Sequence, residues 1–125
     1  MRLLLDTHVL YWSFYEQARL SKRALELIHG AEAIFVSSAS IWEMAIKVRL
    51  GKMKGDPAEV ARLIGRAGFE ELAVWSRHAS FVATLPMHHS DPFDRLLVAQ
   101  AMTEPLHLVT VDEQLRRYSE LVVVV

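Results

Sequence analysis

Short, uninterrupted runs of apolar residues are the feature of this sequence that most limits its possible folds. They occur at residues 3–5, 34–36, 106–111 and 121–125, and a weaker candidate lies at 72–74. A strand that is apolar on both faces must be covered on both faces, which is typical of parallel strands joined by crossover helices. The runs therefore predict a parallel sheet of about five strands.

The segments between the apolar runs carry signals for helix starts and stops. The expected helices begin at or just after Ser21, Ser40, Asp56, Ser76 and Asp91, and a short one follows near residues 111–115. Gly30, Gly51 and Gly68 end the first three helices, and Pro105 lies beyond the helix that starts at Asp91. This alternation predicts an α/β fold and a single domain over residues 1–125.

The charge balance argues against a broad nucleic-acid clamp. The chain has 14 Lys and Arg residues against 15 Asp and Glu residues, whereas such a clamp shows a strong positive excess. The absence of cysteine excludes a disulfide framework and a thiolate metal site. No apolar run approaches the ~20 residues of a membrane span. We therefore expect a cytoplasmic protein without a membrane anchor.

Four acidic residues fall where the predicted sheet would collect them. Asp6 follows the first apolar run, and Asp112 follows the run at 106–111. Glu43 lies on the helix after the second run, and Asp94 lies one turn into the helix that starts at Asp91. Ligands of open parallel sheets bind at the carboxyl ends of the strands. The four carboxylates could therefore share one crevice.

Three of these acids also have a purely structural interpretation. Glu43 lies three residues after Ser40, which is the spacing of a capping box. Asp94 suits the first turn of a helix, and Asp112 could cap a short helix. The stretch 56–59 has the same Asp-Pro-x-acid pattern as 91–94, with no chemistry apparent near it. These alternatives stay open from the residues alone.

Asp6 is harder to explain structurally. It lies between residues 3–5 and Val9, next to a core strand, where an unpaired charge is unfavourable. No Lys or Arg follows before Arg19, which favours a metal ion as its partner. Two carboxylates about 4 Å apart repel by roughly 4 kcal/mol at an effective dielectric near 20. Mg²⁺ or Mn²⁺ would offset that repulsion and could support phosphodiester hydrolysis.

The same residues lie in four stretches that together resemble a known family. The stretches are residues 3–10 (LLLDTHVL), 40–47 (SIWEMAIK), 91–101 (DPFDRLLVAQA) and 108–112 (LVTVD). In this order and spacing they resemble the PIN domain, and more narrowly the VapC-type ribonuclease toxins of bacterial toxin–antitoxin pairs. The resemblance extends over essentially the whole chain.

The resemblance implies a three-layer α/β/α domain that cleaves RNA endonucleolytically with Mg²⁺ or Mn²⁺. It also implies a homodimer and inhibition by a VapB-type antitoxin whose tail occupies the active groove. The catalytic and metal-binding acids of the family match Asp6, Glu43, Asp94 and Asp112. Thr110 matches the hydroxyl residue that often accompanies the last acid. With four acids assigned to metal, the remaining residues carry a net positive charge, which is compatible with local RNA binding.

Supporting residues are expected around these acids. Thr7 follows Asp6 directly, and Lys47 either pairs with Glu43 at i,i+4 or contacts a phosphate. Arg95 could reach a phosphate or a neighbouring carboxylate.

Several further residues keep open roles. The basic stretch of Arg49, Lys52 and Lys54 is either a rim for RNA or a solvated helix end, and Trp12, Phe14 and Tyr15 either stack bases or pack. The roles of His88 and His89 stay undecided, and Asp91 is assigned as a helix cap.

Other function classes fit the sequence less well. A haloacid-type phosphatase requires a second Asp two residues after the first, and His8 stands there. A phosphoacceptor receiver domain requires a late Lys, but only Arg116 and Arg117 follow Asp112. A PIN-like scaffold that binds RNA or protein without cutting it remains the alternative to a nuclease.

Overall fold

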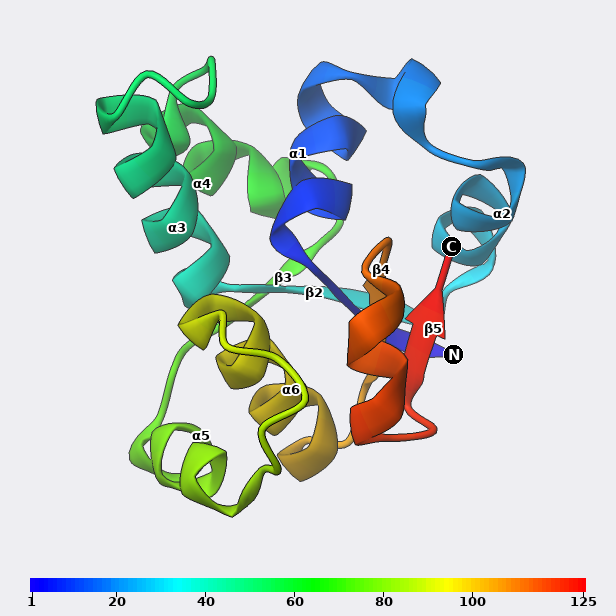
Figure 1. Ribbon diagram of the computed structural model, residues 1–125. Coiled ribbons are helices and arrows are strands. Elements are labelled where there is room, and N and C mark those ends of the chain that lie inside the picture. Colours follow the sequence, from blue (N-terminus) through cyan, green and yellow to red (C-terminus); the bar gives the residue numbers. More distant parts are fainter.

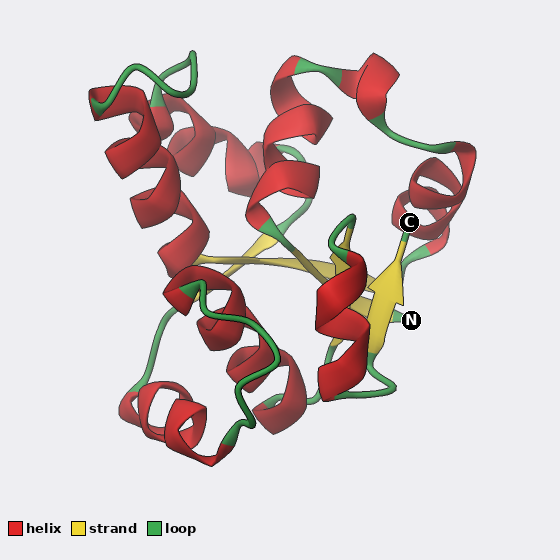
Figure 2. Cartoon of the chain, in the orientation of Figure 1, coloured by secondary structure: helices red, strands yellow, loops and turns green.

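The computed structural model describes residues 1–125, and its five strands form one parallel sheet (Figures 1 and 2). The strands are β1 (Arg2–Leu5), β2 (Ala33–Ser37), β3 (Glu70–Leu72), β4 (His107–Thr110) and β5 (Val122–Val124). Their order across the sheet is β3-β2-β1-β4-β5. The predicted sheet is confirmed, but the weak strand lies earlier than 72–74. Beyond Leu72 the backbone groups form hydrogen bonds with side chains and not with a neighbouring strand. Val74 N–H donates to Ser38 Oγ, and the Ala73 carbonyl accepts from Gln100.

Six α-helices and three 3₁₀ helices surround the sheet. The α-helices are α1 (Thr7–Tyr15), α2 (Lys22–Gly30), α3 (Ser38–Arg49), α4 (Pro57–Arg66), α5 (Ser76–Phe81) and α6 (Pro92–Thr103). The 3₁₀ helices are η1 (Gln17–Arg19), η2 (Val82–Thr84) and η3 (Glu113–Tyr118). None of the helices combines the length and apolar character needed to cross a membrane.

Two separate hydrophobic cores cover the two faces of the sheet. Leu3 and Leu5 point into the core formed with α1, α2, α3 and α4. Leu4 points to the opposite face, into the core formed with α6 and η3. Successive side chains of a strand alternate between faces, so a fully apolar strand requires both layers. Figure 1 shows the resulting three layers, with α5 and α6 across the sheet from α1, α3 and α4. The predicted α/β/α architecture is confirmed.

Most of the predicted helix caps are present. Ser21 accepts from Ala24 N–H (3.1 Å), Asp56 from Ala58 N–H (3.0 Å), and Asp91 from Phe93 N–H (2.8 Å). The interpretation of Ser40 and Glu43 as a capping box is wrong, because α3 begins earlier. Ser37, the last residue of β2, supplies the N-cap instead.

The start of α5 also differs from the prediction. Ser76 is the first residue of the helix rather than its cap. The preceding Trp75 donates its N–H to His78 Nδ1 over 3.0 Å, so a buried imidazole closes the first turn.

Candidate active site

The three central strands end side by side, and polar residues follow each of them. Leu5 of β1 is in register with Val36 of β2 and with Val109 of β4. The next residues, Asp6, Ser37 and Thr110, therefore lie at one edge of the sheet. Asp6 N–H extends the β1–β4 ladder by donating to the Val109 carbonyl over 3.0 Å. The sequence prediction of polar groups at the carboxyl edge is confirmed in this respect.

Asp6 is almost completely buried, with 3% of its surface exposed. Its Oδ1 accepts from Val9 N–H (2.8 Å), which makes it the N-cap of α1, and its Oδ2 accepts from Thr110 Oγ1 (2.5 Å). Burial raises the pKa of Asp6 above its usual value, against these two hydrogen bonds, which lower it. No Lys or Arg forms an ion pair with this carboxylate. The charge is therefore without a basic partner, as the sequence indicated.

Glu43 enters the site from α3 and is also buried, at 4% exposed. Its Oε2 lies 2.9 Å from Lys47 Nζ, which confirms the predicted i,i+4 ion pair. Its Oε1 is buried and has no hydrogen-bond partner. An unpartnered buried carboxylate oxygen is unfavourable unless a cation completes it. This atom is the clearest candidate for a metal ligand at the site.

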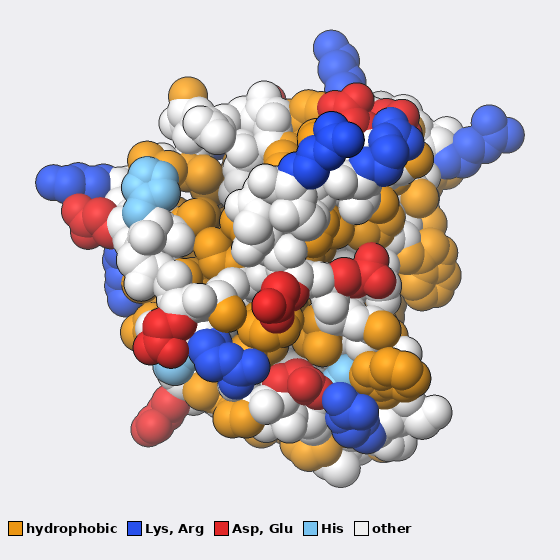
Figure 3. Space-filling view, turned by 180° about the vertical axis from the view of Figure 1, so that it is seen from behind, with side chains coloured by type: hydrophobic (Ala, Val, Ile, Leu, Met, Phe, Trp, Pro, Cys, Tyr) orange, Lys and Arg blue, Asp and Glu red, His pale blue; other side chains and the backbone are white.

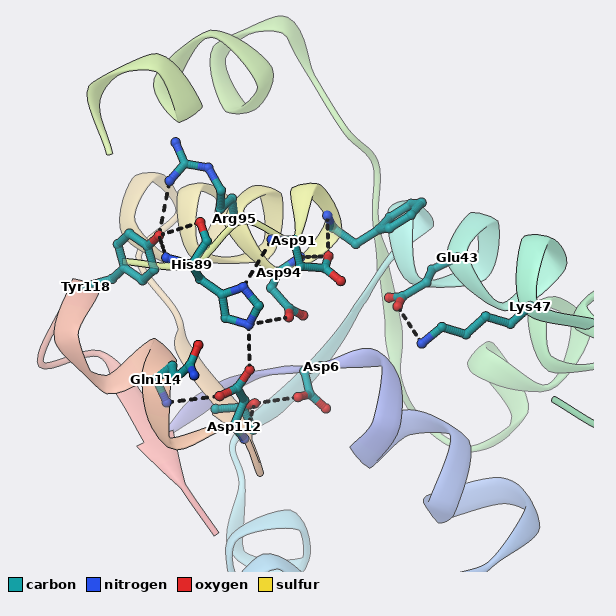
Figure 4. A network of polar contacts seen from close by, with 12 residues as sticks. Asp6, Glu43, Lys47, His89, Asp91, Asp94, Arg95, Asp112, Gln114 and Tyr118 are labelled. Atoms are coloured by element: carbon teal, nitrogen blue, oxygen red, sulfur yellow. Dashed lines mark hydrogen bonds and ion pairs between the residues drawn. The ribbon is translucent and has the colours of Figure 1, made fainter. Parts of the chain in front are cut away.

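Asp94 lies in the first turn of α6 and responds to the other acids. Its pKa is raised to about 7, first by burial and then by the negative charges of Asp91, Asp6 and Glu43. The proximity of His89 has the opposite effect and lowers the pKa of Asp94. Asp6 at the end of β1, Glu43 on α3 and Asp94 on α6 lie near enough for their negative charges to raise the pKa of Asp94 (Figure 4).

Asp112 is connected to the other acids through His89. The role of His89 was undecided from the sequence. His89 Nε2 lies 2.8 Å from Asp112 Oδ2 and 3.5 Å from Asp94 Oδ2. His89 Nδ1 accepts from Asp91 N–H (3.1 Å), so the ring hydrogen lies on Nε2 and points to Asp112. One ligand atom each from His89, Asp94 and Asp112 lies within 4.8 Å of the others. Asp112 also caps η3 by accepting from Gln114 N–H, so its structural interpretation holds as well.

Two threonine hydroxyls link the elements that carry the acids. Thr110 Oγ1 donates to Asp6 and accepts from Asp112 N–H over 3.0 Å, so one hydroxyl connects two carboxylate residues. Thr7 is buried and donates to Ser40 Oγ over 3.0 Å, which ties α1 to α3. No local pattern predicts this partner for Ser40, because 33 residues separate it from Thr7.

Arg95 does not belong to the cluster, which corrects its predicted role. Its guanidinium donates to the carbonyls of Pro86 (2.9 Å) and Val82 (3.2 Å) and to the Tyr118 hydroxyl (3.1 Å). Figure 4 shows it directed towards Tyr118 and away from the acids. Adjacent helical positions are about 100° apart, so Asp94 reaches the site while its neighbour is buried. Arg95 fixes the loop that carries His89.

The donor set fits a hard divalent cation. All four predicted ligands are carboxylates, which hard cations such as Mg²⁺ prefer. Glu43 Oε1 is a buried acceptor without a partner, and burial together with the neighbouring carboxylates raises the pKa of Asp94. Asp6, Glu43, Asp94 and Asp112, with His89 beside the last two, could hold such an ion.

A parallel sheet with acidic residues at its carboxyl edge defines a class of protein, and comparison with known protein families identifies this class. The family described as the PIN domain matches residues 3–121, and the chain belongs to this family. Its relatives include Ribonuclease VapC22 of Mycobacterium tuberculosis (strain ATCC 25618 / H37Rv). The two sequences are 31% identical, over 93% of this chain and 91% of that protein. The resemblance predicted from the four sequence stretches is therefore confirmed.

Solved structures share the fold. One is VapBC2 from Rickettsia felis bound to a DNA fragment from its promoter, with a TM-score of 0.73 and 18% identity over 100% of this chain and 98% of that chain. Another is FitAcB from Neisseria gonorrhoeae, with a TM-score of 0.64 and 18% identity over 90% and 89%. At these identities the likeness establishes the architecture alone.

Proposed function

We propose that residues 1–125 act as a single PIN domain and form a metal-dependent endoribonuclease toxin that hydrolyses phosphodiester bonds of RNA. The observation that carries the proposal is the buried, unpartnered oxygen of Glu43 within a cluster of acids at the sheet edge. The relationship to a ribonuclease, at 31% identity over most of both chains, supports the same activity.

The proposed ligands of Mg²⁺ or Mn²⁺ are Asp6, Glu43, Asp94 and Asp112. A bound ion of this kind polarises the phosphate and lowers the pKa of a coordinated water. The residues of the chain keep the ligands in position. Thr110 orients Asp6, and Lys47 neutralises one oxygen of Glu43 while leaving the other without a partner. His89 holds Asp112 through its Nε2 hydrogen.

The competing proposal is a PIN-like scaffold that binds RNA or protein without cutting it. The presence of all four acids at one sheet edge favours catalysis, because buried carboxylates repel one another and a binding scaffold does not require them. Purified protein should cleave RNA with Mg²⁺ or Mn²⁺, lose activity in EDTA and regain it when metal is restored. Cleavage that persists in EDTA would exclude the metal mechanism, and no cleavage of any RNA with either metal would favour the scaffold.

A cognate VapB-type antitoxin is the proposed protein partner. This rests on the structural neighbours, which include a toxin–antitoxin complex from Klebsiella pneumoniae (TM-score 0.66, 17% identity over 97% of this chain and 95% of that chain). A cytoplasmic location follows from the proposed RNA substrate. Co-expression with the product of a small neighbouring gene should yield a stable complex that lacks RNA cleavage. A complex that cleaves as fast as the free protein would contradict inhibition.

We also propose a homodimer, built on an exposed aromatic patch. Trp42 is 61% exposed and packs edge-on against Phe93 at 5.1 Å between ring centroids. Beside it lies a hollow of about 250 Å³ lined by Trp42, Val74 and Leu96 among others. A twofold contact requires one self-complementary patch, and a projecting ring beside a hollow provides it. Light scattering should give a dimer mass for the wild type and a monomer mass for Trp42→Ala; an unchanged mass would refute this surface.

A further inference from the structure

A polar recess of about 390 Å³ lies along α1. Its walls include His8, Trp12 and Arg19 on one side and Lys52 and Lys54 on the other. His8 is two residues after Asp6, and His8 and Trp12 lie one helical turn apart, a rise of about 6 Å. The proximity of His8 lowers the pKa of Asp6, so this end of the recess lies near the proposed metal site, although none of the four acids lines the recess.

The two walls belong to the elements that carry two of the proposed metal ligands. Asp6 caps α1, which carries His8 and Trp12 on one face, while Glu43 lies on α3, which leads into the loop with Lys52 and Lys54. A chain bound at the carboxylates can therefore continue into the recess between these walls.

The loop of the second wall is held in place. Lys52 N–H donates to the Lys47 carbonyl over 2.8 Å, and Asp56 N–H donates to the Tyr15 hydroxyl of α1 over 3.3 Å. Gly55 has a φ of +119°, and a Cβ at this position would lie 2.9 Å from the Tyr15 ring. The close approach of Gly55 fixes the loop against α1. The recess is therefore formed before any ligand binds.

Flat side chains line the recess near the carboxylates. The Arg19 guanidinium lies 4.8 Å from the centroid of the Trp12 ring, and the His8 ring lies 6.0 Å from the same centroid. Unpaired bases stack on aromatic rings and on arginine planes. Trp12 is only partly buried, so it does not serve the core alone.

The charge of the recess is positive. Lys52 and Lys54 are exposed, and neither forms an ion pair. Arg19 is paired only with the exposed Glu16, at 3.6 Å, and Glu16 also lines the recess, so three cations stand against one acid. The whole chain has a net charge of −1, and on the face behind the view of Figure 1 acidic and basic side chains are interspersed (Figure 3). A local group of three cations beside a tryptophan is thus a distinct feature.

We propose that this recess is a subsite for an unpaired nucleotide of the RNA strand, beside the phosphodiester that is cut. Trp12 stacks the base, and Lys52, Lys54 and Arg19 bind neighbouring phosphates. The inference rests on the proposed ribonuclease function and deepens it, because it names the residues that would bind a nucleotide next to the cleaved bond.

Binding of a fluorescein-labelled single-stranded RNA in EDTA, followed by anisotropy, tests the subsite without cleavage. Trp12→Ala should weaken binding by about five- to 150-fold, and Trp12→Phe should recover most of it. The pair K52A/K54A should reduce the slope of log Kd against log salt by about 1.4, from two lost phosphate contacts on a single strand. The control pair K22A/R62A removes the same charge outside the recess and should leave the slope unchanged.

A cleavage assay separates this inference from the proposed function. On a dinucleotide, which cannot extend from the carboxylates into the recess, the recess variants should cleave at the wild-type rate, while they should be slower on a long strand. Equal loss on both substrates, equal loss in the control pair, or wild-type protein that does not bind RNA would overturn the subsite. RNA binding that depends on Trp12 without any cleavage would instead uphold the subsite and refute the ribonuclease.

Discussion

Replacing Asp94 with Asn should stabilise the metal-free protein, and more strongly at higher pH. Its pKa is raised to about 7 from an ordinary value of 3.8, by burial and by neighbouring carboxylates. The folded state therefore holds a proton more tightly than the unfolded state. As pH rises from about 4 to about 7, the unfolding free energy of the wild type falls, by roughly 4 kcal/mol for this shift. Above pH 7 the loss of unfolding free energy caused by the ionised Asp94 is complete, and below pH 4 this loss disappears.

Asn keeps the shape of the side chain and carries no charge. The stability of Asp94→Asn should therefore exceed that of the wild type by up to about 4 kcal/mol at pH 8 and by about 1–2 kcal/mol at pH 5. Urea unfolding followed by circular dichroism in EDTA measures both differences. The matched control is Asp56→Asn, an exposed helix cap where Asn and Asp are nearly equivalent, which should change little at either pH. A variant that is less stable than wild type at pH 8, or a gain independent of pH, would refute the reasoning.

Three further variants test the roles assigned above. Mn²⁺ should raise the melting temperature of the wild type far more than that of the variant in which all four acids become carboxamides; equal shifts would locate the ion elsewhere. Arg95→Ala should cost about 2–4 kcal/mol in urea unfolding, because three partly buried hydrogen-bond acceptors lose a charged donor. A stable variant with impaired RNA cleavage would instead support the predicted contact of Arg95 with the substrate. Thr110→Val should lower the free energy of unfolding by about 1.5–3 kcal/mol and slow RNA cleavage, because Asp6 Oδ2 loses its hydrogen-bond donor. Thr110→Ser should retain both the stability and the cleavage rate. A Val variant that cleaves at the wild-type rate would show that Thr110 does not support the site.

Local patterns in the sequence were sufficient for the sheet and for most helix starts. An apolar run such as residues 3–5 has to be covered on both faces, and the Asp-Pro pairs at 56 and 91 are cap signals that act within three residues. Errors arose where two local signals competed. Ser37 and Ser40 both suit an N-cap, and Ser37 is used because it ends β2 directly.

The sequence predicted which acids belong to the candidate site, but it did not predict the hydrogen bonds that connect them. Burial of Asp6 follows from its apolar neighbours, so a buried carboxylate without a basic partner could be predicted from the sequence. The contact of His89 with Asp112 spans 23 residues, and the bond from Thr110 to Asp6 spans 104. Such pairs depend on strand order and on the path of the loop before α6, and no local pattern encodes either. Arg95 shows the converse, since adjacency to Asp94 in sequence did not bring it to the site.

The most direct test of the central claim is RNA cleavage by Asp6→Asn in the presence of Mg²⁺ or Mn²⁺. Single-turnover rates should be compared for the wild type, Asp6→Asn and the control Asp56→Asn, each with its fold verified by urea unfolding. The carboxylate at the end of β1 is predicted to be essential, so Asp6→Asn should show no cleavage above background while Asp56→Asn matches the wild type. Wild-type cleavage by folded Asp6→Asn would contradict a carboxylate-metal nuclease at this edge of the sheet.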